Sequence, residues 1–173
     1  MATLRPVPVT PAAIRRATVE DGPRLLVCWQ RARAHNASMD QRVIPATITE
    51  QEFLADFGQM LTRGGSVALV AEIGDELAGF ISGAIEANQP DRLPARHATV
   101  GYLYVDERYR RQGIARSLFA GVAQWALEHK DVSHFEMSVL HADEAAAKFW
   151  RSIGFTPFIS RLWAPLSAPD LDP

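Results

Sequence analysis

Apolar residues follow two different spacings along the chain. Four segments repeat an apolar residue every three or four positions, as an amphipathic helix does: 20–36, 47–63, 114–126 and 142–154. Six other runs are rich in β-branched and aromatic residues, which favour strands: 13–18, 66–73, 76–87, 97–106, 133–140 and 155–166. The predicted order is strand, two helices, three strands, helix, strand, helix, and then one or two final strands.

This order indicates one α/β domain with a mixed sheet. Gly74-Asp75 between two apolar runs predicts a hairpin of antiparallel strands. The helix at 114–126 connects two strands as a crossover, which makes that pair parallel. Because no repeat or linker interrupts the pattern, we expect a single domain over residues 12–167. A flexible N-terminal arm at 1–11 and a polar C-terminal tail at 168–173 flank it.

Composition excludes several classes of protein. The chain has 173 residues, of which 47% are hydrophobic, with 18 basic against 20 acidic side chains. That balance favours an ordinary globular domain and predicts neither a nucleic-acid nor a membrane partner. Cys28 is the sole cysteine, and the histidines at 129, 134 and 141 have no ligand spacing, so we expect no metal. The first twenty residues lack the apolar core of a signal peptide, so the reducing cytoplasm is the expected location.

The most informative segment is VDERYRRQGIARSL, residues 105–118, between a predicted strand and a predicted helix. A helix start carries unpaired backbone N–H groups and partial positive charge, and so suits a phosphate. Gly113 keeps side chains away from these amides, while Arg110 and Arg111 add positive charge. The alternative is a charged, solvated turn. The segment has neither the Gly-Lys-Ser/Thr of a P-loop nor the three glycines of a dinucleotide fingerprint.

Two motifs in this sequence resemble those of the GNAT superfamily of N-acyltransferases. Arg110, Gly113 and Ala115 match the family's acyl-CoA-binding pattern, Arg/Gln-x-x-Gly-x-Gly/Ala after a strand. Downstream, DEAAAKFWRSIGF (143–155) is similar to the family's Asn-x-x-Ala-x-x-x-Tyr followed by Gly-Phe. There Asp143 takes the place of the Asn and Trp150 that of the Tyr. The resemblance extends over about residues 13–166.

The resemblance implies a fold and a cofactor site. The fold would be a mixed, mostly antiparallel sheet of six or seven strands, splayed between strands four and five and flanked by about four helices. Acetyl-CoA would be the co-substrate, with its pantetheine arm paired to backbone groups of Leu103 and Val105. The diphosphate would meet the amides from Arg111 through Gln112, Gly113 and Ile114 to Ala115, beside Arg110, with Asp143 and Trp150 nearby.

The catalytic groups are less clearly marked. Acyl transfer to an amine uses a base for the ammonium and a donor for the thioester carbonyl, and an acid for the thiolate is the least necessary group. Trp150 cannot act as the family's tyrosine acid, and Thr99 occupies the place where the family often has a glutamate base. The candidates in this sequence are Tyr104, Glu72 and His141, followed by Tyr102, Glu86 and Glu136; a water chain is the alternative.

The sequence therefore predicts an N-acetyltransferase in which the amine of a small molecule or peptide attacks acetyl-CoA directly within a ternary complex. A non-catalytic acyl-CoA-binding module or sensor is the alternative, suggested by Trp150 and Thr99. Dimers are common in the family, so a homodimer stays open. The acceptor is expected to bind near the first two helices and the last strands.

Overall fold

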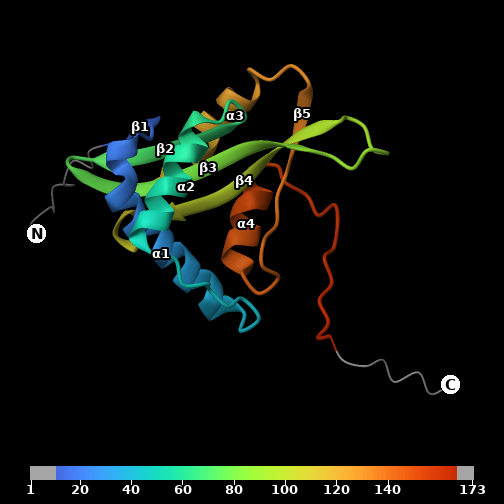
Figure 1. The fold of residues 1–173 in the computed structure, drawn as a ribbon, viewed down its shortest axis with the longest axis horizontal. Helices are drawn as coiled ribbons and strands as arrows, with labels where there is room; N and C mark the ends of the chain where they lie inside the picture. Colours follow the sequence, from blue (N-terminus) through green and yellow to red (C-terminus); the bar gives the residue numbers. More distant parts are fainter. Residues whose placement is uncertain (1–10, 167–173) are drawn as a thin grey trace, which may run out of the picture.

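Five strands form one sheet in the computed structural model, which describes residues 11–166 (Figure 1). They are β1 (Ala13–Arg16), β2 (Ser66–Ile73), β3 (Glu76–Ala87), β4 (Arg96–Val105) and β5 (Val132–Glu136). Their order in the sheet is the order in the chain. β1 to β4 are joined as antiparallel neighbours, and β4 and β5 are parallel, as the crossover helix requires.

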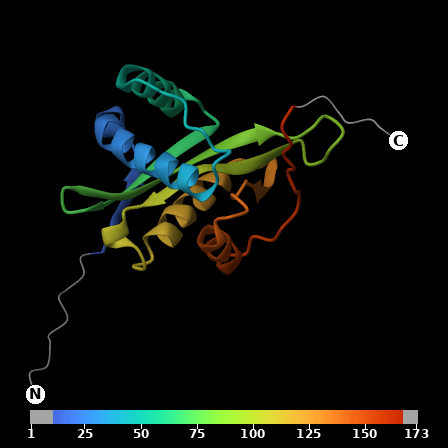
Figure 2. The same cartoon turned by 90° about the horizontal axis from the view of Figure 1, so that it is seen from below.

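Helices cover both faces of this sheet. α1 (Gly22–Met39) and α2 (Glu50–Thr62) lie on one face, and α3 (Ile114–Ala126) and α4 (Glu144–Ser152) on the other (Figure 2). Two short 3-10 turns, η1 (Val19–Asp21) and η2 (Glu107–Tyr109), precede α1 and follow β4. A hydrophobic core lies on each face of the sheet, and alternate residues of β2 contribute to one or the other. Val70 belongs to the same core as Leu25 and Phe80. Leu69 belongs to the other core, with Leu118 and Val122. Burial on both faces explains the nearly unbroken apolar runs of β2 and β3.

Local signals in the sequence place the helix ends. At the start of α2, the Glu52 amide donates to Thr49 Oγ1 at 3.2 Å and the Thr49 amide donates to Glu52 Oε2 at 2.8 Å. Thr49 and Glu52 thus form a capping box, in which two otherwise unpaired backbone amides are satisfied reciprocally. Gly74 in the β2–β3 turn has a φ of +59°, which is in the left-handed region that favours glycine. Within residues 11–166, no helix is both long and apolar enough to cross a membrane.

The predicted count of six or seven strands is wrong, because residues 155–166 form no strand. Pro157 and Pro165 remove backbone donors from this segment, and β5 is only five residues long, so its outer edge offers a short ladder. Phe158 instead lies under the Arg92 guanidinium and Trp163 under that of Arg42, at 4.9 and 5.6 Å from the ring centroids. The predicted arm and tail, apart from Pro11, lie outside the described residues.

Candidate functional site

The sheet opens between β4 and β5. β4 pairs with β3 along its whole length, from Arg96 to Val105. Its pairing with β5 ends at Thr99, opposite Glu136. The rest of β4 therefore has a neighbouring strand on one side only. The predicted splay is present, and it leaves a row of strand backbone groups available for an extended ligand.

A β-bulge lies just beyond the last β4–β5 pair. Gly83 is opposite Val100 and Ser82 is opposite Tyr102, so Gly101 is the extra residue on β4. The Tyr102 amide donates to Ser82 Oγ at 3.0 Å, and a Cβ on Gly101 would lie only 2.9 Å from that oxygen. Glycine is needed here because the hydroxyl approaches so closely. The bulge twists β4 where the sheet opens.

The corner after β4 contains two left-handed backbone positions just before α3. Arg111 and Gly113 have φ angles of +65° and +82°, and Gly113 is the N-cap of α3. Within residues 11–166, no amide from Arg111 to Ala115 donates a hydrogen bond to the protein. A Cβ on Gly113 would meet no atom within 4 Å, so the space in front of the corner is open. Converging amides at a helix N-terminus form a concavity for an anion.

Asp106 anchors this corner and was not singled out in the sequence. It is 5% exposed and accepts from the Arg108 amide and Arg108 Nε, both at 3.0 Å, and from Arg31 Nη1 at 2.7 Å. The hydrogen bond from Arg108 and the charges of both guanidinium groups hold the pKa of Asp106 below its usual range. Its own amide donates to the Ala78 carbonyl at 2.9 Å. The corner is thereby fixed to both β3 and α1. The signal in the sequence that could have identified Asp106 is its position as an acidic residue directly after a β-forming run.

A cavity of about 370 Å³ lies between α1 and the corner. Its walls are Arg31, Ala34, His35 and Ser38 of α1, Tyr104 of β4, and Glu107 and Arg110 of the corner. Arg110 also donates from Nε to the Val105 carbonyl at 3.1 Å. Burial raises the pKa of the Tyr104 phenol, while the neighbouring Arg31 guanidinium opposes that shift. Tyr104 is therefore protonated at neutral pH and suited to donate a hydrogen bond.

A second cavity, of about 160 Å³, lies farther back along β4. It is lined by Arg33 and Asn36 of α1, Tyr102 of β4, and the loop residues Val43, Ile44, Pro45 and Ala46. Tyr102 and Tyr104 are two positions apart and so share one face of the strand. The two cavities consequently follow one another along β4 toward the bulge. Sequence reasoning named both tyrosines but neither Arg31 nor Arg33. Without the structure, these two arginines are indistinguishable from other polar residues of the helix.

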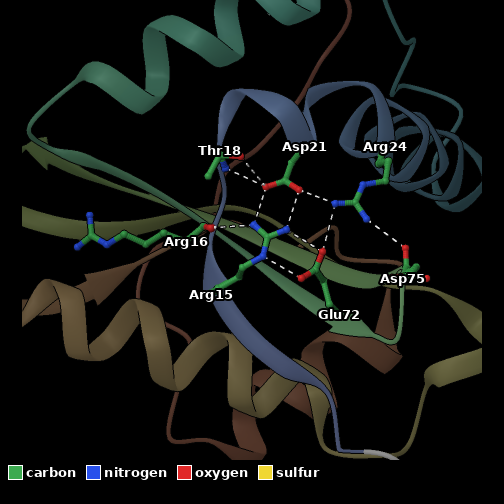
Figure 3. Close-up of polar contacts among 7 residues, drawn as sticks. All are labelled: Arg15, Arg16, Thr18, Asp21, Arg24, Glu72 and Asp75. Atoms are coloured by element: carbon green, nitrogen blue, oxygen red, sulfur yellow. Dashed lines mark hydrogen bonds and ion pairs between the residues drawn. The ribbon is translucent and has the colours of Figure 1, made fainter.

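Glu72 lies away from this site, in a polar cluster beside β1 (Figure 3). Arg15 donates to it from Nε and Nη2 at 2.8 and 2.7 Å, and Arg24 Nη2 donates to it at 3.1 Å. The hydrogen bonds from Arg15 are the main reason that the pKa of Glu72 is lowered. β2 is two strands away from β4. The structure therefore does not bring Glu72 to the corner or to either cavity.

The remaining base candidates do not line either of the two cavities. His141 is exposed in the turn that precedes α4, and Glu86 is exposed near the end of β3. Glu136 accepts from Arg92 and from His134 Nε2, and these contacts, the one with Arg92 first, lower its pKa. Among the described side chains proposed for proton transfer, Tyr102 and Tyr104 are the ones that line these two cavities.

Asp143 is the N-cap of α4, and Trp150 lies within this helix. Asp143 Oδ1 accepts from the Ala146 amide at 2.9 Å and caps α4, while its Oδ2 lies 3.0 Å from His35 Nε2. This contact joins the C-terminal half of α1 to the start of α4, across the open part of the sheet. Trp150 is 6% exposed and packs within an aromatic cluster, with ring centroids 5.0 to 5.5 Å from Phe149, Phe155 and Phe119.

For the acetyl transfer that the sequence predicts, substituting Trp150 with Phe is expected to preserve most of the turnover. The ring would keep its apolar neighbours, and the lost volume should cost about 1–2 kcal/mol of stability. Steady-state rates and urea unfolding of the variant measure the two effects. A collapse of turnover with folding and CoA affinity intact would show that the indole takes part in the chemistry.

The open sheet edge, the amide-rich corner and the two adjoining cavities form one candidate site along β4. The chain belongs to the GNAT acetyltransferase family: residues 31–155 match the model of the "Acetyltransferase (GNAT) family". No curated protein sequence matches the chain.

Solved structures share the fold at low sequence identity. A tetramutant of the BH1408 protein from Bacillus halodurans has a TM-score of 0.77 at 20% identity, covering 89% of this chain and 99% of its own. AAC(6')-Iy in complex with the bisubstrate analogue CoA-S-monomethyl-acetylneamine gives 0.74 at 14% identity, covering 92% and 100%. The aminoglycoside antibiotic 6'-N-acetyltransferase AAC(6')-IG from Acinetobacter haemolyticus gives 0.68 at 16%, covering 91% and 99%. These likenesses establish the fold.

Proposed function

We propose that this protein transfers the acetyl group of acetyl-CoA to an amine. The observation that carries the proposal is the corner between β4 and α3: in the described part of the chain no amide from Arg111 to Ala115 has a protein acceptor, and a Cβ on Gly113 would meet open space. A diphosphate satisfies such amides and interacts favourably with the N-terminus of α3. Membership of the GNAT family makes acetyl-CoA the co-substrate that fits this site.

The pantetheine arm then lies along β4, toward the bulge. Beyond Thr99 the strand has no β5 partner, so its backbone groups can pair with the amides of the arm, as proposed for Leu103. The Val105 carbonyl already accepts from Arg110, which limits what that residue can offer. Arg31 and Arg110 line the nearby cavity, where they are paired with Asp106 and Glu107, and each guanidinium keeps further N–H donors that can bind an anionic cofactor.

In the reaction the amine nitrogen attacks the thioester carbonyl. The C–N bond forms, the C–S bond breaks, and CoA leaves as a thiolate that takes up a proton. The ammonium substrate gives up two protons in all, one taken up by CoA and one released to solvent. Tyr104, whose pKa is raised by burial, lines the cavity with Arg31 and is the proposed proton donor to the thiolate. Holding both substrates beside β4 supplies much of the remaining acceleration.

A binding module without catalysis is the second candidate. Two positions favour it: Trp150 is buried in the aromatic cluster where the family pattern has a tyrosine, and Thr99 offers no base. Such a protein would hold acyl-CoA at the same corner without transfer. CoA binding alone therefore does not separate the two candidates.

Release of CoA thiol from acetyl-CoA over a panel of amines separates them. The proposal expects amine-dependent release, with an acetylated product of the matching mass. Tyr104→Phe should lower kcat about 10- to 100-fold while CoA affinity changes little. Acetyl-CoA binding with no release in the presence of any amine would favour the binding module.

A further inference from the structure

The cavity beside Tyr102 has one charged side chain in its wall, and that side chain is cationic. Arg33 stands among the polar groups of Asn36 and Tyr102 and the apolar stretch from Val43 to Ala46. Within residues 11–166, no carboxylate lines this cavity. At about 160 Å³ it is smaller than the pockets that hold drug-sized ligands.

Arg33 is held in place before any ligand arrives. Its guanidinium carbon lies 4.3 Å from the centroid of the Trp29 ring, and Nη2 donates to the Ala46 carbonyl at 2.6 Å. Trp29 is itself fixed by contacts with Phe53 and Tyr102, whose ring centroids lie 5.0 and 6.3 Å away. A guanidinium has five N–H donors, and the bond to Ala46 uses one of them. A positioned guanidinium loses little side-chain entropy when it binds a carboxylate.

The surrounding charges oppose a polycationic ligand. The nearby Asp40 is paired with Arg42, whose hydrogen bond lowers the pKa of that carboxyl to about 2. In the adjoining cavity, Arg31 is paired with Asp106 and Arg110 with the lining carboxylate Glu107, so the lining offers a polycation no carboxylate that lacks a cationic partner. A ligand with several ammonium groups would thus meet the Arg33 guanidinium and no lining carboxylate in the small cavity.

We propose that the acceptor is a small amine that carries both a carboxylate and an apolar side chain, as a free apolar amino acid does. Arg33 binds the carboxylate, and the loop from Val43 to Ala46 contacts the apolar group. The amine is then directed along β4 toward the bulge, where the thioester is expected. This inference rests on the proposed acetyl transfer and specifies its acceptor. It separates this protein from the aminoglycoside acetyltransferases that share its fold.

Leucine and leucinamide form a matched pair of acceptors, because the amide lacks the carboxylate and keeps the amine and side chain. With acetyl-CoA saturating, kcat/KM should be at least 10-fold higher for leucine than for leucinamide. Spermidine and kanamycin serve as polycationic probes and should be acetylated less efficiently than leucine. Both chain folding and acetyl-CoA binding are checked by thermal unfolding with and without acetyl-CoA.

The Arg33→Gln variant tests the side chain itself. It should lower kcat/KM for leucine about 10- to 100-fold, mainly through KM, and affect leucinamide much less. Arg16→Gln is the matched control, since it removes an exposed arginine of β1 outside both cavities. Arg33→Lys should recover part of the leucine activity, because it restores the charge without the forked geometry.

Several outcomes would overturn the inference. Leucinamide as good as leucine, a preference for spermidine or kanamycin, or an equal loss for both probes in Arg33→Gln would each exclude carboxylate recognition. These results would leave acetyl transfer itself standing. Lack of transfer to every amine, with acetyl-CoA still bound, would overturn the proposed function together with its acceptor.

Discussion

Gly113→Val is expected to abolish CoA binding, with affinity reduced at least about 100-fold. Gly113 has a φ of +82°, which a β-branched residue adopts only with strain. Its side chain would also stand in front of the amides from Arg111 to Ala115. Because a Cβ there meets no protein atom within 4 Å, the substitution causes no internal clash. Calorimetric titration of CoA against the folded variant measures the loss.

Gly74→Val is the matched control for backbone strain. Gly74 also has a positive φ and open space around its Cβ position, but it lies in the β2–β3 turn. The Gly74→Val variant should lose stability and retain CoA binding.

Arg110→Ala should weaken CoA binding by only about 1 kcal/mol, because its exposed guanidinium contributes one partly solvated contact. That loss should shrink as salt is raised. Normal affinity in Gly113→Val would mean that the corner is only a turn.

Asp21→Asn is expected to destabilise the fold by about 3 kcal/mol. Asp21 is 1% exposed and accepts two hydrogen bonds from Arg15, at 2.7 and 2.9 Å, and one from Arg24 at 2.8 Å (Figure 3). Its Oδ2 also accepts from the Thr18 amide at 2.9 Å. The neutral amide leaves both guanidinium groups poorly matched. The solvent exposure of the two arginines keeps the effect at the lower end for a buried pair. Urea unfolding monitors the change.

The effect of Asp21 should depend on pH in one direction. The hydrogen bond from Arg15, more than any other contact, holds the pKa of Asp21 well below its usual range. In the unfolded chain an aspartate has a pKa of about 3.9. Its stabilisation is therefore complete above that value and is lost as the pH falls below about 4. The difference between wild type and Asp21→Asn should stay constant near neutral pH and shrink in acid.

Glu128→Gln provides the control for this pH dependence, since Glu128 is an exposed carboxylate near the end of α3. It should change the free energy of unfolding by less than about 0.5 kcal/mol. A stability loss in Asp21→Asn no larger than that of Glu128→Gln, or a loss that grows in acid, would show that the cluster contributes little to folding.

The parts of the site that depend on local sequence could be predicted. The corner is a strand end, a glycine and a helix start within a few residues, so the segment 105–118 was enough to place it. The order of the elements followed from hydrophobic periodicity for the same reason. Asp143 at the start of α4 also follows a local rule, because a short acceptor side chain suits an N-cap.

The parts that depend on tertiary contacts could not be predicted. Glu72 was predicted as a base candidate. In the structure it is bound by Arg15 of β1, which also binds Asp21 of η1. Arg33 acquires its position from Trp29 and from a loop that follows α1, which helical spacing does not reveal. Residues 155–166 have strand-forming composition, yet a strand also needs a partner edge and backbone donors. The sequence of residues 155–166 alone does not show whether these requirements are met.

The most direct measurement is the melting temperature of the chain as acetyl-CoA is added. A ligand that binds only the native state at 100 times its Kd stabilises it by about 2.7 kcal/mol. For a domain of this size that corresponds to a rise of roughly 5–10 °C. We predict a rise of this order at millimolar acetyl-CoA in the wild type, and none in Gly113→Val. A melting temperature of the wild type that stays constant up to millimolar acetyl-CoA would contradict an acyl-CoA site at this corner.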